Sequence, residues 1–214
     1  MIVFWAWFGI SAIAFLRHFP DGFWPVSLAI VWWLIVVFRG PLQSAVRKVH
    51  LPTWVKYFLL GLFFTDVVME NLAVSFHGDL NPNIFLNSFL WIGAYLGVLL
   101  GWWLVARWYR VTPSQVFFLY GISGVIAEQN LMVPKMLFHG QIPTALLTIP
   151  LLIVVYGTAV APVFVILEDE LPRPERRLNL IGGVIAALLP MGLFYALAYP
   201  WFRFAALLGL KIPS

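Results

Sequence analysis

Apolar runs long enough to cross a lipid bilayer follow one another along almost the whole chain. A transmembrane helix needs about 20 mainly apolar residues. The chain offers seven such runs: Met1–Leu16, Phe23–Phe38, Trp54–Phe76, Ile84–Trp108, Pro113–Phe138, Pro143–Leu167 and Leu178–Tyr199. The pattern predicts an all-α, polytopic membrane protein with one transmembrane domain over residues 1–214. Because the first two runs are short and could form a tilted hairpin, the expected number of transmembrane helices is six to seven.

Composition excludes an ordinary soluble domain. Only 10% of the residues are charged, against about 25% in soluble proteins, and mean hydropathy is +0.92. The first run has no basic segment before it and no small-residue cleavage site after it, so we expect a retained helix rather than a cleaved signal peptide. Cysteine is absent, which excludes disulfides, thiolate metal ligands and a cysteine nucleophile.

Lysine and arginine are distributed unevenly between alternate connections. Nine of the thirteen flank the connections after the second, fourth and sixth runs: Arg39, Arg47, Lys48, Lys56, Arg107, Arg110, Arg173, Arg176 and Arg177. The positive-inside rule then predicts a cytoplasmic N-terminus, in the cytoplasmic membrane of a prokaryote. The expected partners are the lipid bilayer and other membrane proteins. Nucleic acid is not expected, because the basic residues lie at helix ends. The acidic run Glu168-Asp169-Glu170 predicts a solvated turn, with a partner-docking loop as the alternative.

Small and special residues indicate how the helices begin and pack. Thr112 before Pro113 predicts a helix N-terminus with proline in the first position. The stripe Gly93, Gly97 and Gly101 predicts close backbone approach to a neighbouring helix inside the bundle. Gly121 and Gly124 predict the same for the fifth run.

A parallel repeat of two helical hairpins, runs three–four and five–six, is a further hypothesis. Asn71-Leu72 precedes Phe76-His77-Gly78, just as Asn130-Leu131 precedes Phe138-His139-Gly140. A tyrosine follows in each case, Tyr95 and Tyr156. Runs three and five point the same way, so the repeat axis would lie along the membrane normal.

Ionisable residues inside two of the runs mark the candidate site. A charged residue at bilayer depth costs about 2.5–3.5 kcal/mol and is by default a functional hypothesis. At about 100° per residue, Asp66, Glu70 and His77 share one face of run three, and Glu128, Lys135 and His139 share one face of run five. The predicted ligand or proton pathway comprises Asp66, Glu70, Asn71, His77, Glu128, Gln129, Asn130, Lys135 and His139.

Pro134 predicts an interruption of run five. It cannot donate to the carbonyl of Asn130, and a freed carbonyl beside Glu128 is typical of a broken helix at a binding site. A plain proline kink is the alternative.

A metal site is not predicted. Glu70 and His77 would lie ~10 Å apart along their helix, and Glu128 and His139 ~16 Å, too far to share an ion. The usual hydrolase motifs are missing as well.

Three classes of function remain open from the sequence. The paired acidic stripes favour a small transporter or a proton or ion pathway. An intramembrane enzyme acting on a lipid or isoprenoid substrate would use the same carboxyls as acid and base. A structural or cofactor-holding subunit of a larger membrane complex fits the small size and the aromatic content of 17%. No particular pigment, haem, quinone or metal is indicated.

Overall fold

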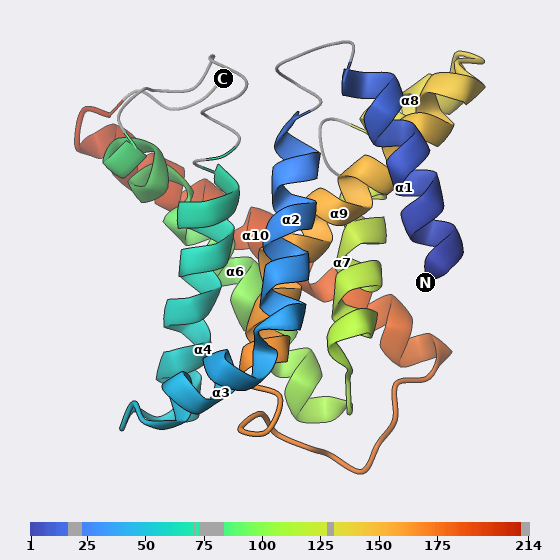
Figure 1. Ribbon diagram of the computed structural model, residues 1–214. Coiled ribbons are helices and arrows are strands. Elements are labelled where there is room, and N and C mark those ends of the chain that lie inside the picture. Colours follow the sequence, from blue (N-terminus) through green and yellow to red (C-terminus); the bar gives the residue numbers. More distant parts are fainter. Residues whose placement is uncertain (17–22, 71, 73–83, 128–130, 211–214) are drawn as a thin grey trace.

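The computed structural model of the chain describes residues 1–16, 23–70, 72, 84–127 and 131–210, and within them the fold is entirely helical (Figure 1). The predicted all-α class is therefore confirmed. The elements are α1 (Ile2–Phe15), α2 (Phe23–Val37), α3 (Arg39–Arg47), α4 (Thr53–Leu62), the π-helix η2 (Phe63–Glu70), α6 (Ile84–Trp108), α7 (Pro113–Ala127), α8 (Met132–Phe138), α9 (Ile142–Ile166) and α10 (Leu180–Leu207). The described residues form no β-strand, and their one β-bridge is isolated, between Arg110 and Arg177.

Helix α9 forms the centre of the bundle. It contacts α1, α2, α7 and η2, and every residue from Pro150 to Ile166 is buried. A helix that is apolar all round is expected to be buried all round. Helix α10 is just as apolar but crosses the back of the bundle obliquely and packs mainly on α6 (Figure 1). Its outer side exposes large apolar residues such as Leu188 and Ile181, as a lipid-facing surface requires.

Three helices are long and apolar enough to cross a membrane: α6 over Phe85–Trp108, α9 and α10. The helices α2 and α3 together would make a fourth span, although α3 is bent by 70° from α2. Helices α1 and α7 are apolar but shorter. Most helices overlap the seven predicted runs, but α3 lies between the second and third runs and α10 extends beyond Tyr199 to Leu207. The number of spans and the hairpin repeat stay predictions.

Glycines bring two pairs of helices close together, as predicted. A β-carbon at Gly97 would collide with the backbone of Leu193 in α10, and one at Gly101 would come within 2.8 Å of the Pro190 nitrogen. In α7, a β-carbon at Gly121 would come within 2.8 Å of the Ile153 carbonyl oxygen in α9. The stripe of α6 therefore faces α10 inside the bundle.

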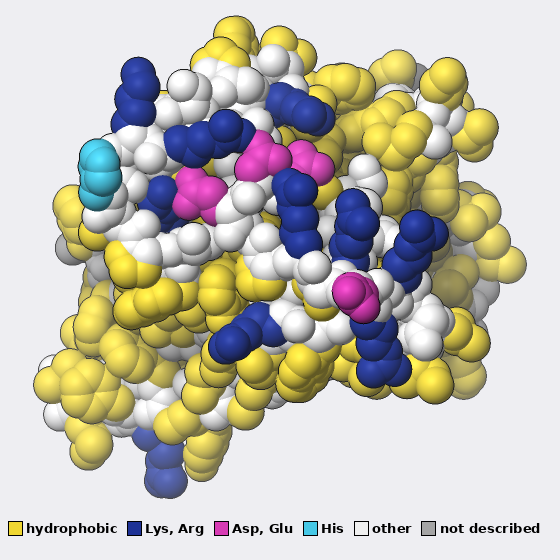
Figure 2. All heavy atoms as spheres, turned by 90° about the horizontal axis from the view of Figure 1, so that it is seen from below, with side chains coloured by type: hydrophobic (Ala, Val, Ile, Leu, Met, Phe, Trp, Pro, Cys, Tyr) yellow, Lys and Arg dark blue, Asp and Glu magenta, His cyan; other side chains and the backbone are white. Residues whose placement is uncertain are grey.

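Basic side chains gather at one end of the molecule, from α3, the start of α4 and the segments 107–112 and 173–177 (Figure 2). The acidic run after α9 lies among them and is not simply a solvated turn. Asp169 pairs with Arg47 and Arg173. Glu170 accepts from the Nζ of Lys56, at 2.9 and 3.1 Å, and that lysine is only 7% exposed. These ion pairs fasten the acidic segment to α3 and α4.

Candidate functional site

Asp66 and Glu70 both lie on the π-helix η2, which continues α4 without a break. Hydrogen bonds in a π-helix run from residue i to i+5, and such segments are frequent at functional sites. The Thr65 hydroxyl donates to the Gly61 carbonyl at 2.8 Å, a bond that competes with the α-helical ladder and bends helices. The predicted helix is present, but its periodicity over these residues is not that of an α-helix.

Three polar residues of α6 face the two carboxyls: Asn87, Ser88 and Tyr95. The Tyr95 hydroxyl donates a hydrogen bond to Oε1 of Glu70. The Asn87 amide lies against the same Glu70 carboxyl, and the Ser88 hydroxyl is within hydrogen-bonding reach of Asp66. The two carboxyls are also close enough to interact electrostatically. This group of five residues, from η2 and α6, is called the carboxyl cluster below.

Most of the carboxyl cluster is buried. Asp66 is 5% exposed, Asn87 1% and Tyr95 4%. One of its polar atoms, Oδ1 of Asp66, is buried and has no hydrogen-bond partner among the described residues. Leaving such an atom unpaired costs about 1–3 kcal/mol, and in a native structure each case calls for an explanation. A buried acceptor of this kind suits a polar ligand or a proton that binds and is released.

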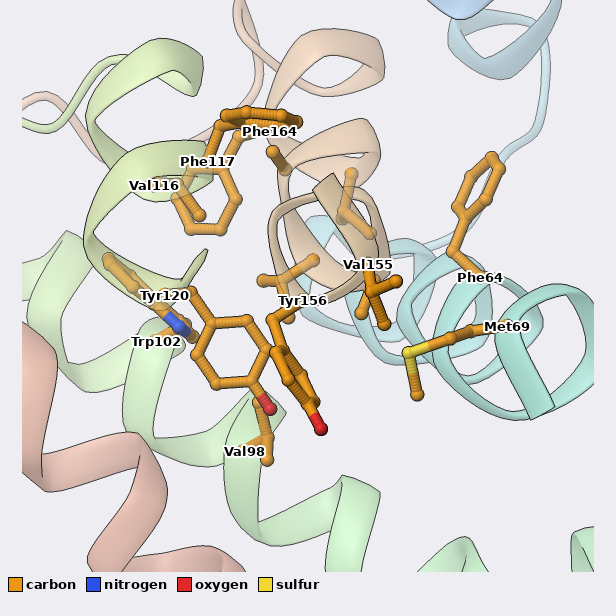
Figure 3. Packing of buried hydrophobic residues seen from close by; sticks show 14 of the residues in the cluster. Phe64, Met69, Val98, Trp102, Val116, Phe117, Tyr120, Val155, Tyr156 and Phe164 are labelled. Carbon is orange, nitrogen blue, oxygen red and sulfur yellow. The ribbon is translucent and has the colours of Figure 1, made fainter. Parts of the chain in front are cut away.

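Two further tyrosines lie in the core next to α6. Tyr120 of α7 and Tyr156 of α9 meet edge to face, with ring centroids 6.2 Å apart. Their hydroxyls point the same way, toward Val98 of α6 (Figure 3). On the other side of α9, Phe64 and Met69 of η2 pack toward Val155 (Figure 3). The π-helix thus turns apolar residues to α9, while its carboxyls face α6.

Of the other predicted site residues, the structure describes Lys135 and His139, and neither is part of the carboxyl cluster. Lys135 and His139 are exposed and belong to α8 or its end, in the upper right of Figure 1. The other predicted residues lie outside the part of the chain that the structure describes: Asn71, His77, Glu128, Gln129 and Asn130. A shared site between runs three and five, with Glu70 facing Glu128, therefore stays a prediction.

The expectation that one regular helix carries positions 128, 135 and 139 on a single face is wrong. Helix α7 ends at Ala127 and α8 begins at Met132, after Leu131 in a left-handed conformation with φ 61°. Helical periodicity cannot be carried across such a break. The predicted interruption exists, but its cause differs from the one expected, because Pro134 lies in the first turn of α8, where its missing N–H costs nothing.

Sequence reasoning missed Asn87 and Ser88 and used Tyr95 only as a mark of a repeat. A signal was available: Ser88 and Tyr95 are seven residues apart, so they share one helical face inside an otherwise apolar run. Nothing in the sequence shows that this face meets Asp66 and Glu70.

Among the described residues, no group of three or more His, Asp or Glu side chains is arranged to hold a metal ion. No protein-family model, no curated protein and no solved structure matches the chain. Functional reasoning therefore rests on the geometry of the carboxyl cluster.

Proposed function

We propose that the protein is a small membrane transporter that provides a pathway for protons, with Asp66 and Glu70 as the groups that bind and release them. The observation that carries the proposal is a pair of neighbouring carboxyls on a half-buried π-helix, faced by hydroxyl and amide groups of α6. Intramembrane Asp and Glu chains serve as proton relays in pumps and transporters.

Tyr95 adds a third proton-exchanging group to Asp66 and Glu70. Its hydroxyl donates to Glu70, and a hydroxyl can both donate and accept a proton. The unpaired Oδ1 of Asp66 supplies an acceptor next to this pair. Because Asp66 and Glu70 also interact electrostatically, we propose that protons pass among the oxygen atoms of the carboxyl cluster.

The proposal includes seven spans and a cytoplasmic basic end. Its support is the agreement between the seven apolar runs and the helices, together with the gathering of nine Lys and Arg residues at one end of the bundle. In this arrangement the carboxyl cluster lies beyond that end, within the span formed by α4 and η2.

The test is proton flux into proteoliposomes that contain a trapped pH-sensitive dye, driven by a valinomycin-induced potassium diffusion potential. We expect flux with the unaltered protein and a loss of about 100-fold or more in Asp66→Asn and Glu70→Gln, as for removal of a proton-transferring group. Glu175→Gln is the matched control, because Glu175 is exposed at the basic end.

Absence of flux in the unaltered protein, or wild-type flux in both variants, would contradict the proposal. Replacing the external sodium and potassium by a large organic cation distinguishes protons from metal cations. Flux that disappears with those ions would show that the pathway carries the ions instead.

A second candidate is an intramembrane enzyme that protonates a lipid or isoprenoid substrate. It is favoured by the aromatic residues beside the carboxyl cluster: Trp91 and Phe194 both make ring contacts with Tyr95. Aromatic faces stabilise positive charge, as protonation of a carbon–carbon double bond would require. A new organic-extractable product from membrane lipids, formed by the unaltered protein and not by Glu70→Gln, would support this candidate.

A further inference from the structure

A small cavity lies at the basic end of the molecule, away from the carboxyl cluster. It has a volume of about 230 Å³ and is formed by the end of α6, the start of α7 and the segment that follows α9. Its polar walls are Arg110, Thr112, Glu168 and Arg173, while Ala106 and Phe164 close it on the apolar side. Pockets for drug-sized ligands measure roughly 300–1,000 Å³, so this one suits a smaller group.

The backbone around the cavity is well anchored. The Arg110 N–H donates to the Arg176 carbonyl at 2.8 Å, and Arg110 forms a β-bridge with Arg177. Thr112 and Gln115 cap the start of α7 reciprocally: the Thr112 N–H donates to Oε1 of Gln115 at 2.8 Å, and the Gln115 N–H to Oγ1 of Thr112 at 3.3 Å. This is a capping-box arrangement. Backbone hydrogen bonds and a helix cap therefore fix the walls of the cavity.

The two arginines of the cavity have different surroundings. Arg173 is engaged, because its guanidinium donates to Oδ1 of Asp169 at 2.9 Å and to the Glu168 carbonyl at 3.3 Å. Arg110, by contrast, has no carboxylate partner among the described residues. Its charge is available to a ligand in the cavity.

The wider electrostatics favour an anion. The basic end carries nine Lys and Arg against four Asp and Glu, an excess of five positive charges. The cavity also adjoins the N-terminus of α7, a helix of 15 residues, whose dipole favours negative charge there. Glu168 is the one acidic side chain in the wall.

The neighbourhood resembles the boundary between lipid headgroups and hydrocarbon. Trp108, two residues before Arg110 in the chain, is 49% exposed, and tryptophan is enriched at that level of the bilayer. The guanidinium of Arg176 lies over the ring of Tyr109, 4.7 Å from its centroid. Basic pockets between transmembrane helices are known to bind anionic headgroups.

We propose that this cavity binds the phosphate of an anionic lipid headgroup, with Arg110 as its main charged ligand. The lipid would hold the end of α6, the start of α7 and the segment after α9 together.

The experiment titrates the detergent-purified protein with phosphatidylglycerol or with phosphatidylcholine, and follows bound lipid by native mass spectrometry and unfolding by temperature. We expect phosphatidylglycerol to bind and to raise the unfolding temperature, and phosphatidylcholine to do neither. Arg110→Gln should weaken phosphatidylglycerol binding about tenfold or more, as expected for the loss of a hydrogen bond to a charged group.

Two further variants make the result decisive. Lys48→Gln removes the same charge from an exposed position outside the cavity, and should leave binding nearly unchanged. Glu168→Gln removes the acidic wall and should tighten binding. Equal losses in Arg110→Gln and Lys48→Gln would indicate diffuse attraction to a basic surface and overturn the site. Weaker binding in Glu168→Gln would also overturn it, since a bound anion is repelled by Glu168.

A final measurement tests whether inorganic phosphate alone raises the unfolding temperature. If millimolar phosphate stabilises the protein as strongly as the lipid does, and Arg110→Gln abolishes this effect, the cavity takes a soluble phosphate and the lipid assignment is wrong. A stabilisation that requires the lipid supports the proposal.

Discussion

Individual carboxyl groups are kept inside this bundle by partners on a neighbouring helix. Glu70 accepts from the Tyr95 hydroxyl, and Ser88 lies within reach of Asp66. Even so, Oδ1 of Asp66 has no hydrogen-bond partner among the described residues. A purely structural polar cluster would be expected to satisfy all of its buried atoms. The incomplete pairing is the residue-scale reason for treating the cluster as a working site.

Tyr95→Phe should separate the structural part of the cluster from its chemistry. The variant removes the hydroxyl that donates to Glu70 and keeps the ring that packs against Trp91 and Phe194. Hydrogen bonds inside membranes average only about 0.6 kcal/mol, so thermal unfolding should change little, whereas proton flux should fall. The carboxyl stretching region of the infrared spectrum should shift because Glu70 loses a donor. An unchanged spectrum would show that Tyr95 does not bind Glu70.

Two irregularities in the helices determine which side chains share a face. The π-helix η2 places Asp66 and Glu70 on the side of α6 and leaves Phe64 and Met69 for α9. The left-handed Leu131 separates α7 from α8. Both irregularities occur within runs that contain acidic residues, and both alter which side chains share a face.

Close packing of α6 on α10 depends on glycine at the contact. Gly97→Ala would push a β-carbon into the Leu193 backbone, and overpacking of this kind typically costs about 1–3 kcal/mol. We expect a lower unfolding temperature in detergent, by several degrees. Gly192→Ala in α10 is the control, since nothing lies within 4 Å of the added carbon and alanine is the better helix former. Its unfolding temperature should stay the same or rise. Equal behaviour of the two variants would contradict the packing described here.

The whole molecule has one strongly basic end, drawn together from parts of the chain that are distant in sequence (Figure 2). Buried Lys56 pairs with Glu170, and Arg47 with Asp169, so the ion pairs join α3 and α4 to the segment after α9. An excess of lysine and arginine on one side is the main determinant of membrane orientation. The proposed topology therefore puts this end in the cytoplasm.

Single cysteines test that topology directly, because the chain has none of its own. Ser44→Cys and Ser114→Cys lie at the basic end, and Gln141→Cys lies in the connection between α8 and α9; all three positions are exposed. In intact cells an impermeant maleimide should label only Gln141→Cys, and all three should react once the cells are opened. Labelling of the first two in intact cells, with Gln141→Cys silent, would mean the reverse orientation.

Properties that depend on short stretches of chain could be predicted from the sequence. Hydropathy determined the helical class and the approximate helix ranges, and the pair Thr112-Pro113 marked the start of α7. Gly97 and Gly121 were recognised as packing positions, since a helix face without side chains has few other uses in a membrane. Asp66 and Glu70 stood out because a carboxyl is rare within an apolar run.

Only the tertiary structure decided which groups meet those carboxyls. The periodicity of one helix defines a face but not the helix that this face contacts, so Asn87, Ser88 and Tyr95 could not be assigned to Asp66 and Glu70. The same reason hid the pairing of Lys56 with Glu170, which are 114 residues apart. The π-helix also escaped prediction. The Thr65 hydroxyl that donates to the Gly61 carbonyl is local, but a threonine in an apolar run does not by itself specify a π-helix, and η2 forms where it packs against both α6 and α9.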